Sequence, residues 1–256
     1  MLLAVTLLTS GFSSRYLILR HGQTDHNALG IIQGSSDTSR LTQLGSEQAR
    51  EAGATIAQLT DLLPIDRVFV SPNTRAQQTL TELRRALPDL PDVTVVDELR
   101  EIDLGSWEGR NKSELKAEQP QVYDAWQRDP LGFALDDGAM RPVIDLWERA
   151  AVAWGTLHGD AEATRPRDDG AAPVTLIVSH NACGQALLCT ALGLDASHFR
   201  RFEFANCAAV EVEFGAGGDE DAPPRWRWRV GPRAPSPDAA DPPCFYIADD
   251  ILMQRG

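Results

Sequence analysis

Basic residues are scarce in this sequence. Its 256 residues include 24 Lys and Arg against 37 Asp and Glu, which gives a formal net charge of −13. Proteins that bind nucleic acids usually carry a basic surface, and binding to an anionic membrane also requires basic residues. The composition therefore argues against both kinds of partner. An anionic substrate would have to be held by a local cluster of positive groups, in a pocket rather than on an open face.

Cysteines and long apolar runs are also scarce. The four cysteines form no C-x-x-C pair and no zinc-type spacing with histidine. Cys183 and Cys189 lie in an apolar, helix-like run, which favours small buried thiols and a reducing compartment. No run of about 18 apolar residues is present, so no segment is predicted to span a membrane. The apolar residues 1–14 lack the basic start of a signal peptide, and the sequence leaves their role open.

The chain alternates between short apolar or β-branched runs and longer runs with helical periodicity. We expect one domain over residues 15–232, preceded by the apolar segment 1–14 and followed by a Pro-rich tail at 233–256. The predicted fold class is α/β: a three-layer α/β/α sandwich with a mainly parallel sheet and an antiparallel edge strand. The expected strands are 15–19, 67–70, 93–96, 174–178, 208–214 and 226–230, and the expected helices are 43–59, 74–86, 113–127, 143–157 and 182–192.

Side chains suited to phosphate chemistry follow four of the expected strands. Arg20 and His21 come at the end of the first strand, and Arg75 follows the second. Glu101 follows the third, and His180 the fourth. Ligands of such sheets bind beyond the carboxyl ends of the strands, so we expect these residues to lie together. Arginine matches phosphate oxygens, and a neutral imidazole is a nucleophile or base at neutral pH. A lone histidine could equally be structural, but this combination favours a reactive site.

This arrangement resembles the histidine phosphatase superfamily, whose fold is also called phosphoglycerate-mutase-like. The resemblance covers about residues 15–214 and rests on Arg-His-Gly-Gln-Thr at 20–24, Ser-Pro at 71–72 with Arg75, Glu101 and His180, in the family's order. The second half is similar to the plant 2-carboxy-D-arabinitol-1-phosphatase branch. There His180-Asn181 stands where mutases commonly have His-Gly. The likeness implies a soluble intracellular protein, cytoplasmic or plastid, with the choice between these open.

The resemblance also implies roles for single residues. His21 would attack the phosphorus in line and become a phosphohistidine. Arg20, Arg75 and His180 would bind the equatorial oxygens, where negative charge must be stabilised. Glu101 would protonate the leaving alkoxide and then take a proton from water, which requires a carboxyl group that stays protonated near neutral pH. The implied substrate-binding residues are Asn27, Gln33, Gly34 through its backbone amide, and Asn181; Gln33 could instead hydrogen-bond within its loop.

The predicted function is a metal-independent phosphomonoesterase that acts without a cofactor on a small phosphorylated sugar acid or related metabolite. A phosphoglycerate mutase-type transfer is the first alternative, decided by how well residues 110–141 exclude water from the phosphoenzyme. A non-catalytic relative that binds phosphate or a partner protein is disfavoured because both His21 and Glu101 are present. A metal-dependent hydrolase is disfavoured because no set of metal ligands is evident.

Asp103 and Glu108 are interpreted as acceptors for loop backbone. The substrate and the oligomeric state stay open.

Overall fold

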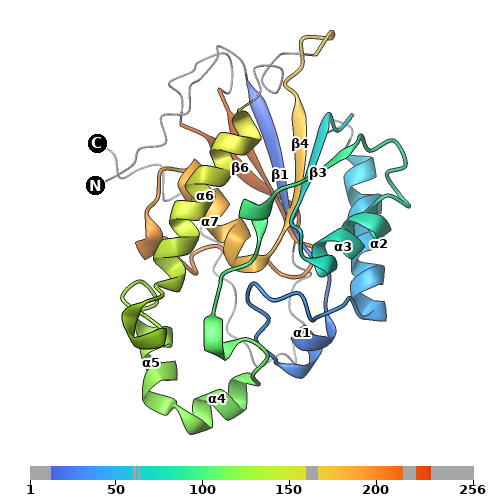
Figure 1. Cartoon of the computed structure of the whole chain (residues 1–256). Helices are drawn as coiled ribbons and strands as arrows, with labels where there is room; N and C mark the ends of the chain where they lie inside the picture. The colour runs from blue at the N-terminus through green and yellow to red at the C-terminus, as the bar shows by residue number, and fades with distance from the viewer. Residues whose placement is uncertain (1–12, 60–61, 63, 160–166, 216–222, 232–256) are drawn as a thin grey trace.

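The computed structural model describes residues 13–59, 62, 64–159, 167–215 and 223–231. Its six strands are β1 (Ser14–Arg20), β2 (Arg67–Val70), β3 (Val93–Val95), β4 (Val174–Ser179), β5 (Ala209–Phe214) and β6 (Arg225–Val230). They form one sheet in the order β3-β2-β4-β1-β5-β6 (Figure 1). β1 to β4 are mutually parallel, β5 pairs antiparallel with β1, and the edge strand β6 pairs antiparallel with β5. The predicted fold class is confirmed: the sheet is mainly parallel, and its edge strand β6 is antiparallel to its neighbour. Most of the apolar N-terminal segment and the Pro-rich tail lie outside the described residues.

Helices cover both faces of the sheet because the central strands are apolar on both faces. In β1, Leu17 and Leu19 point into the core under α2 (Gln43–Gln58) and α3 (Thr74–Leu83). Tyr16 and Ile18 point into the core under α6 (Pro142–His158) and α7 (Asn181–Ala191). All four side chains are fully buried, as expected for a strand between two helical layers. The three layers are visible in Figure 1.

Four of the expected helices are present, with ends within three residues of the prediction. The helix expected at 113–127 is wrong as a single element, because it is split into α4 (Lys112–Glu118) and α5 (Pro120–Arg128). Pro120 has no N–H to continue α4, and proline suits the first position of a new helix. The short α1 (Asp25–Leu29), which was not predicted, begins where Thr24 accepts a hydrogen bond from the Asn27 N–H. Short 3₁₀ turns lie at Asp97–Leu99, Gly105–Trp107, Asp136–Gly138 and Ala196–His198.

Residues 110–141, which include α4 and α5, form a cap at the end of the molecule near α1 (Figure 1). Trp126 lies in an aromatic cluster there, with its ring centroid 5.1 Å from that of Phe133. The Arg200 guanidinium stacks 4.6 Å from the Trp126 ring centroid and donates to the main-chain oxygens of Trp126 and Gln127. These oxygens belong to the last turn of α5, so Arg200 connects the cap to the segment that precedes β5. Within the described residues, no helix is long and apolar enough to cross a membrane.

Candidate active site

The carboxyl ends of the parallel strands bring the five predicted catalytic residues together. Arg20 ends β1 and His21 follows it, while Arg75 lies in the first turn of α3, after β2. His180 follows β4 and stands at the position before the first residue of α7. The rings of His21 and His180 have centroids 5.2 Å apart, and Arg75 Nε lies 3.2 Å from His180 Nδ1. Glu101 reaches the same place from the segment after β3, by contacting the first turn of α7.

His21 has one nitrogen bound and one free. The ring is buried, with 2% of its surface exposed, and its Nδ1 lies 2.7 Å from the main-chain oxygen of Gly22. A carbonyl oxygen can only accept, so Nδ1 carries the proton and Nε2 keeps its lone pair. No described residue hydrogen-bonds to Nε2. Burial lowers the pKa of His21 well below its ordinary value, and the charges of Arg20 and Arg75 lower it further. The ring is therefore neutral near pH 7, with Nε2 ready to act as a nucleophile.

Two glycines allow the backbone around His21 to pack against the start of α2. A Cβ atom on Gly22 would lie 2.4 Å from the Gly45 oxygen, and one on Gly45 would lie 2.0 Å from the Gln23 oxygen. Both distances are too short for real side chains. The Gly22 N–H also donates to Thr79 Oγ1 at 3.0 Å, which links it to α3. A larger residue at 22 or 45 would therefore force apart the backbone after His21 and the start of α2.

Arg75 is fully buried and is held by main-chain oxygens. It donates to the oxygens of Gly34 (2.8 Å) and Ser36 (2.7 Å). Burial lowers the pKa of Arg75 from its ordinary value, and the nearby carboxylate of Glu101 acts in the opposite direction. Arginine remains charged in either case. Arg20 offers a second guanidinium: one of its nitrogens donates to the Phe204 oxygen at 2.6 Å, and its buried Nε has no partner among the described residues.

Glu108 fixes the loop at residues 34–36 from the other side. Its two carboxylate oxygens accept from the N–H groups of Ser35 (2.7 Å) and Ser36 (3.0 Å). Gly34 has φ +53°, and a Cβ atom there would lie 2.0 Å from Glu108 Oε1, so only glycine fits. Glu108 is thus an acceptor for loop backbone, as predicted, and Asp103 accepts in the same way from a backbone N–H at 2.9 Å.

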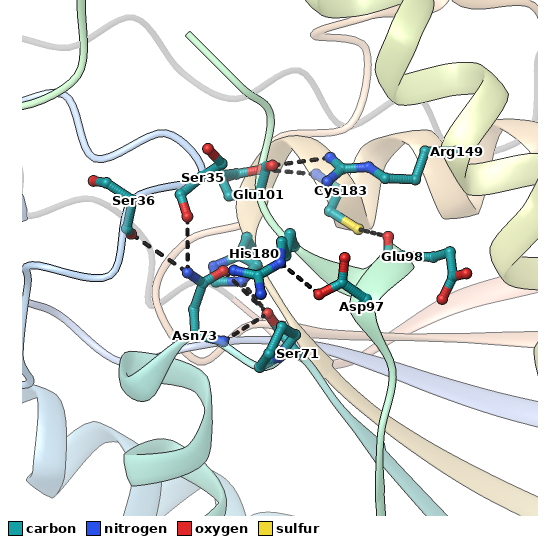
Figure 2. A network of polar contacts seen from close by, with 12 residues as sticks. Ser35, Ser36, Ser71, Asn73, Asp97, Glu98, Glu101, Arg149, His180 and Cys183 are labelled. Atoms are coloured by element: carbon teal, nitrogen blue, oxygen red, sulfur yellow. Dashed lines mark hydrogen bonds and ion pairs between the residues drawn. The ribbon is translucent and has the colours of Figure 1, made fainter. Parts of the chain in front are cut away.

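Both ring nitrogens of the fully buried His180 have protein partners. Arg75 Nε donates to its Nδ1, so the proton lies on Nε2, which is 2.8 Å from Ser71 Oγ. The Ser71 hydroxyl in turn donates to Asn73 Oδ1 at 3.2 Å (Figure 2). Burial, with the charge of Arg75, lowers the pKa of His180 well below its ordinary value. A phosphate oxygen that bound His180 would therefore replace one of these partners.

Glu101 accepts hydrogen bonds from three backbone N–H groups. Oε1 accepts from Ile102 (2.9 Å) and Cys183 (3.0 Å), and Oε2 accepts from Ala182 (3.2 Å) in the first turn of α7. Arg149 of α6 donates to the Glu101 main-chain oxygen at 2.9 Å (Figure 2). Donors at the N-terminus of a helix suit the oxygens of a carboxyl group. They fix the Glu101 carboxyl group at the start of α7.

Asn27 offers a neutral donor. Its Oδ1 accepts from the Thr24 N–H at 3.2 Å and from Asn206 Nδ2 at 3.4 Å. Its Nδ2 has no acceptor among the described residues, so it is free to bind an anion. Asn27 lies in α1, directly after the segment that carries His21.

The side-chain oxygens of the remaining two predicted substrate-binding residues have protein partners, whereas their NH₂ groups have no acceptor among the described residues. Gln33 Oε1 accepts from the hydroxyls of Thr24 (3.0 Å) and Ser39 (2.7 Å), so it hydrogen-bonds within its own loop. Asn181 Oδ1 accepts from the Phe204 N–H at 3.0 Å. In this structure both side chains stabilise loops around the site.

Three residues that hydrogen-bond to residues of the site were not predicted from the sequence: Asn73, Arg149 and Asn206. Asn73 stands two residues before Arg75, in the same Ser-Pro-Asn-Thr-Arg segment, and Asn206 stands shortly before β5. Those positions were signals that could have identified them. Arg149 lies in an amphipathic helix and has no local signal. Among the described residues, no group of three or more His, Cys, Asp or Glu side chains could hold a metal ion.

Comparison with known proteins identifies relatives of the chain. The sequence model of the family described as "Histidine phosphatase superfamily (branch 1)" matches residues 16–221. A 2-carboxy-D-arabinitol-1-phosphatase of Triticum aestivum is 35% identical over 207 residues, which are 79% of this chain and 37% of the wheat protein. The chain thus spans well under half the length of that plant relative.

Two bacterial relatives match over most of their length. A protein of Cronobacter sakazakii named a probable phosphoglycerate mutase is 32% identical over 197 residues, which are 77% of this chain and 83% of that protein. The native structure of a mycobacterial glucosyl-3-phosphoglycerate phosphatase has a TM-score of 0.67 and 27% identity, and the match covers 85% of this chain and 98% of that one.

Proposed function

The chain belongs to the histidine phosphatase superfamily, and on this premise we propose that it is a phosphomonoesterase that acts through a phosphohistidine at His21. The observation that carries the proposal is the state of that ring: Nδ1 is bound to the Gly22 oxygen, and Nε2 is unprotonated beside two arginines. The substrate would be a small phosphorylated metabolite. A sugar acid or related hydroxy acid is favoured, because the similar wheat and mycobacterial proteins are named for phosphate esters of such acids.

The proposed reaction has two steps. His21 Nε2 forms a bond to phosphorus while the bond to the leaving oxygen breaks, and Glu101 gives that oxygen a proton. Water then attacks the phosphohistidine, Glu101 takes the proton from the water, and the bond between phosphorus and nitrogen breaks. Arg20, Arg75 and Asn27 supply N–H donors for the equatorial oxygens, where charge must be stabilised in both steps. His180 joins them when a phosphate oxygen replaces one of its present partners.

A mutase is the second candidate because one similar protein is named a probable phosphoglycerate mutase. In a mutase, a second hydroxyl of the substrate takes the phosphoryl group in place of water. The cap would decide between the two outcomes, because water must be excluded from a phosphoenzyme that is to return its phosphoryl group. Asn181, where the mutases commonly have glycine, favours the phosphatase.

A screen of phosphorylated metabolites tests the proposal. Each compound is incubated with the protein, and both inorganic phosphate and positional isomers of the substrate are measured. We expect phosphate release from at least one phosphorylated sugar acid. Isomerisation without phosphate release would favour the mutase, and neither product from any compound would contradict both.

We expect chelators to leave the activity intact. Two guanidinium groups and an amide can stabilise the transferring phosphoryl group, which a metal ion does in other phosphatases. The measurement is phosphate release before and after dialysis against EDTA. Loss of activity that is restored by zinc or magnesium would overturn the prediction.

We expect the imidazole of His21 to stay neutral when the pH falls below its ordinary pKa of 6.5. Burial and the two arginines lower the pKa of His21, so the nucleophilic form persists on the acid side and is lost only well below pH 6.5. Titration of the imidazole by NMR measures this directly and avoids the ionisation of the substrate phosphate. A titration midpoint near 6.5 for His21 would contradict it.

A further inference from the structure

We propose that Asn206 is a positioning residue that turns the Asn27 amide so that its NH₂ group faces the phosphoryl group. The inference rests on the proposed function, since it concerns the same phosphate site. Asn206 lies in the loop before β5, far in sequence from the segment that carries His21. Its amide joins the His21 main chain and the Asn27 side chain, with Nδ2 3.1 Å from the His21 oxygen and 3.4 Å from Asn27 Oδ1.

Several residues of the loop before β5 contact the two residues at the end of β1, Arg20 and His21. The Phe204 oxygen accepts from the Arg20 guanidinium at 2.6 Å. The Cys207 N–H donates to the same His21 oxygen as Asn206, at 3.3 Å. Cys207 has φ +58°, a conformation that is uncommon for residues other than glycine and that is often retained at functional sites. The loop therefore fixes the main chain of the proposed nucleophile.

The orientation of the Asn27 amide follows from its partners. Oδ1 accepts from the Thr24 N–H (3.2 Å) and from Asn206 Nδ2 (3.4 Å), and the single proton of the Thr24 hydroxyl is within reach of both Oδ1 (3.1 Å) and Gln33 Oε1 (3.0 Å). Only the oxygen of an amide can accept, so these donors fix Oδ1 on their side and leave Nδ2 on the other. A phosphate oxygen accepts hydrogen bonds and would be repelled by Oδ1. Without Asn206, the amide loses one of the donors that keep Nδ2 facing the anion.

The test is a double-mutant cycle on phosphate binding, which needs no turnover. The affinity for inorganic phosphate is measured by calorimetry for the wild type, Asn206→Ala, Asn27→Ala and the double variant, with the thermal midpoint of each. Each single change should weaken binding by about tenfold, the scale of a hydrogen bond to a charged group. The double variant should bind no more weakly than Asn27→Ala alone, because Asn206 acts through Asn27.

Asn111→Ala is the matched control, because Asn111 also donates to a main-chain oxygen, that of Leu29 at 2.9 Å, while its Oδ1 accepts from the Ser113 N–H at the start of α4. It should leave phosphate affinity unchanged. If Asn206→Ala does not fold, Asn206→Leu keeps about the same volume and removes the donor without adding a charge, and it too should weaken binding.

Two results would overturn the positioning role. One is an unchanged phosphate affinity in folded Asn206 variants, and the other is losses that add in the double variant. A wild-type protein that binds phosphate but hydrolyses no ester would instead contradict the proposed function. The phosphate affinities of the four proteins could still be compared in that case.

Discussion

His21→Ala is expected to abolish both phosphoenzyme formation and turnover, with a loss of roughly 10⁴-fold or more, as when a catalytic nucleophile is removed. The physical reason is that no neighbouring group can replace Nε2. The ring of His180 is close, with centroids 5.2 Å apart, but Arg75 and Ser71 occupy both of its nitrogens. The measurement is phosphate release together with the amount of phosphoenzyme after rapid quenching.

His198→Ala is the control for this variant. His198 lies in the short 3₁₀ turn at Ala196–His198 and pairs with Asp195 at 3.3 Å, so it should leave turnover near the wild-type rate. Phosphoenzyme or substantial turnover in folded His21→Ala would show that another group is the nucleophile.

Glu101→Gln is expected to slow turnover of alkyl phosphates by about 10²–10⁴-fold, the usual contribution of general acid–base catalysis. Glutamine keeps the size and one acceptor oxygen but cannot protonate an alkoxide. The deficit should shrink for p-nitrophenyl phosphate, whose leaving oxygen needs little protonation. Phosphohistidine should accumulate, because activation of water by Glu101 is lost as well. Turnover of both esters and the phosphoenzyme level are the measurements.

The control here is Asp103→Asn, because Asp103 is an exposed carboxylate whose one acceptor contact within the described part of the chain is with the Gly105 N–H at 2.9 Å. It should stay near the wild-type rate. Because the Glu101 carboxylate also caps α7, the thermal midpoint of Glu101→Gln must be measured in parallel. Equal slowing on both esters, with no trapped phosphoenzyme, would show that Glu101 is not the acid, and Asp103 would be the next candidate.

The sheet could be predicted because its strands are short apolar runs separated by clear helical periodicity. The predicted strand at 174–178 corresponds to β4, which is buried along its whole length. The break between α4 and α5 was missed because helical periodicity continues through it, although Pro120 marks the new start. The grouping of Arg20, His21, Arg75 and His180 could be predicted from topology alone, since each lies at or after the end of a parallel strand.

Contacts between distant segments could not be predicted. Which partners hold His180, and that Glu101 caps α7, depend on how α7 packs beside the segment after β3. The same holds for Arg149, whose contact with the Glu101 oxygen joins residues 48 positions apart. Periodicity and strand order determine which elements meet, but hydrogen-bond partners depend on atomic packing.

The most direct test of the central claim is to locate the phosphoryl group on the enzyme. Glu101→Gln is mixed with a radiolabelled phosphate ester, quenched in alkali, in which phosphohistidine is stable, and digested for mass spectrometry. We predict one label, on the peptide that carries His21, and none when His21→Ala is added to the same variant. A label on another residue, or turnover of the wild type with no phosphoenzyme at any time, would contradict the mechanism.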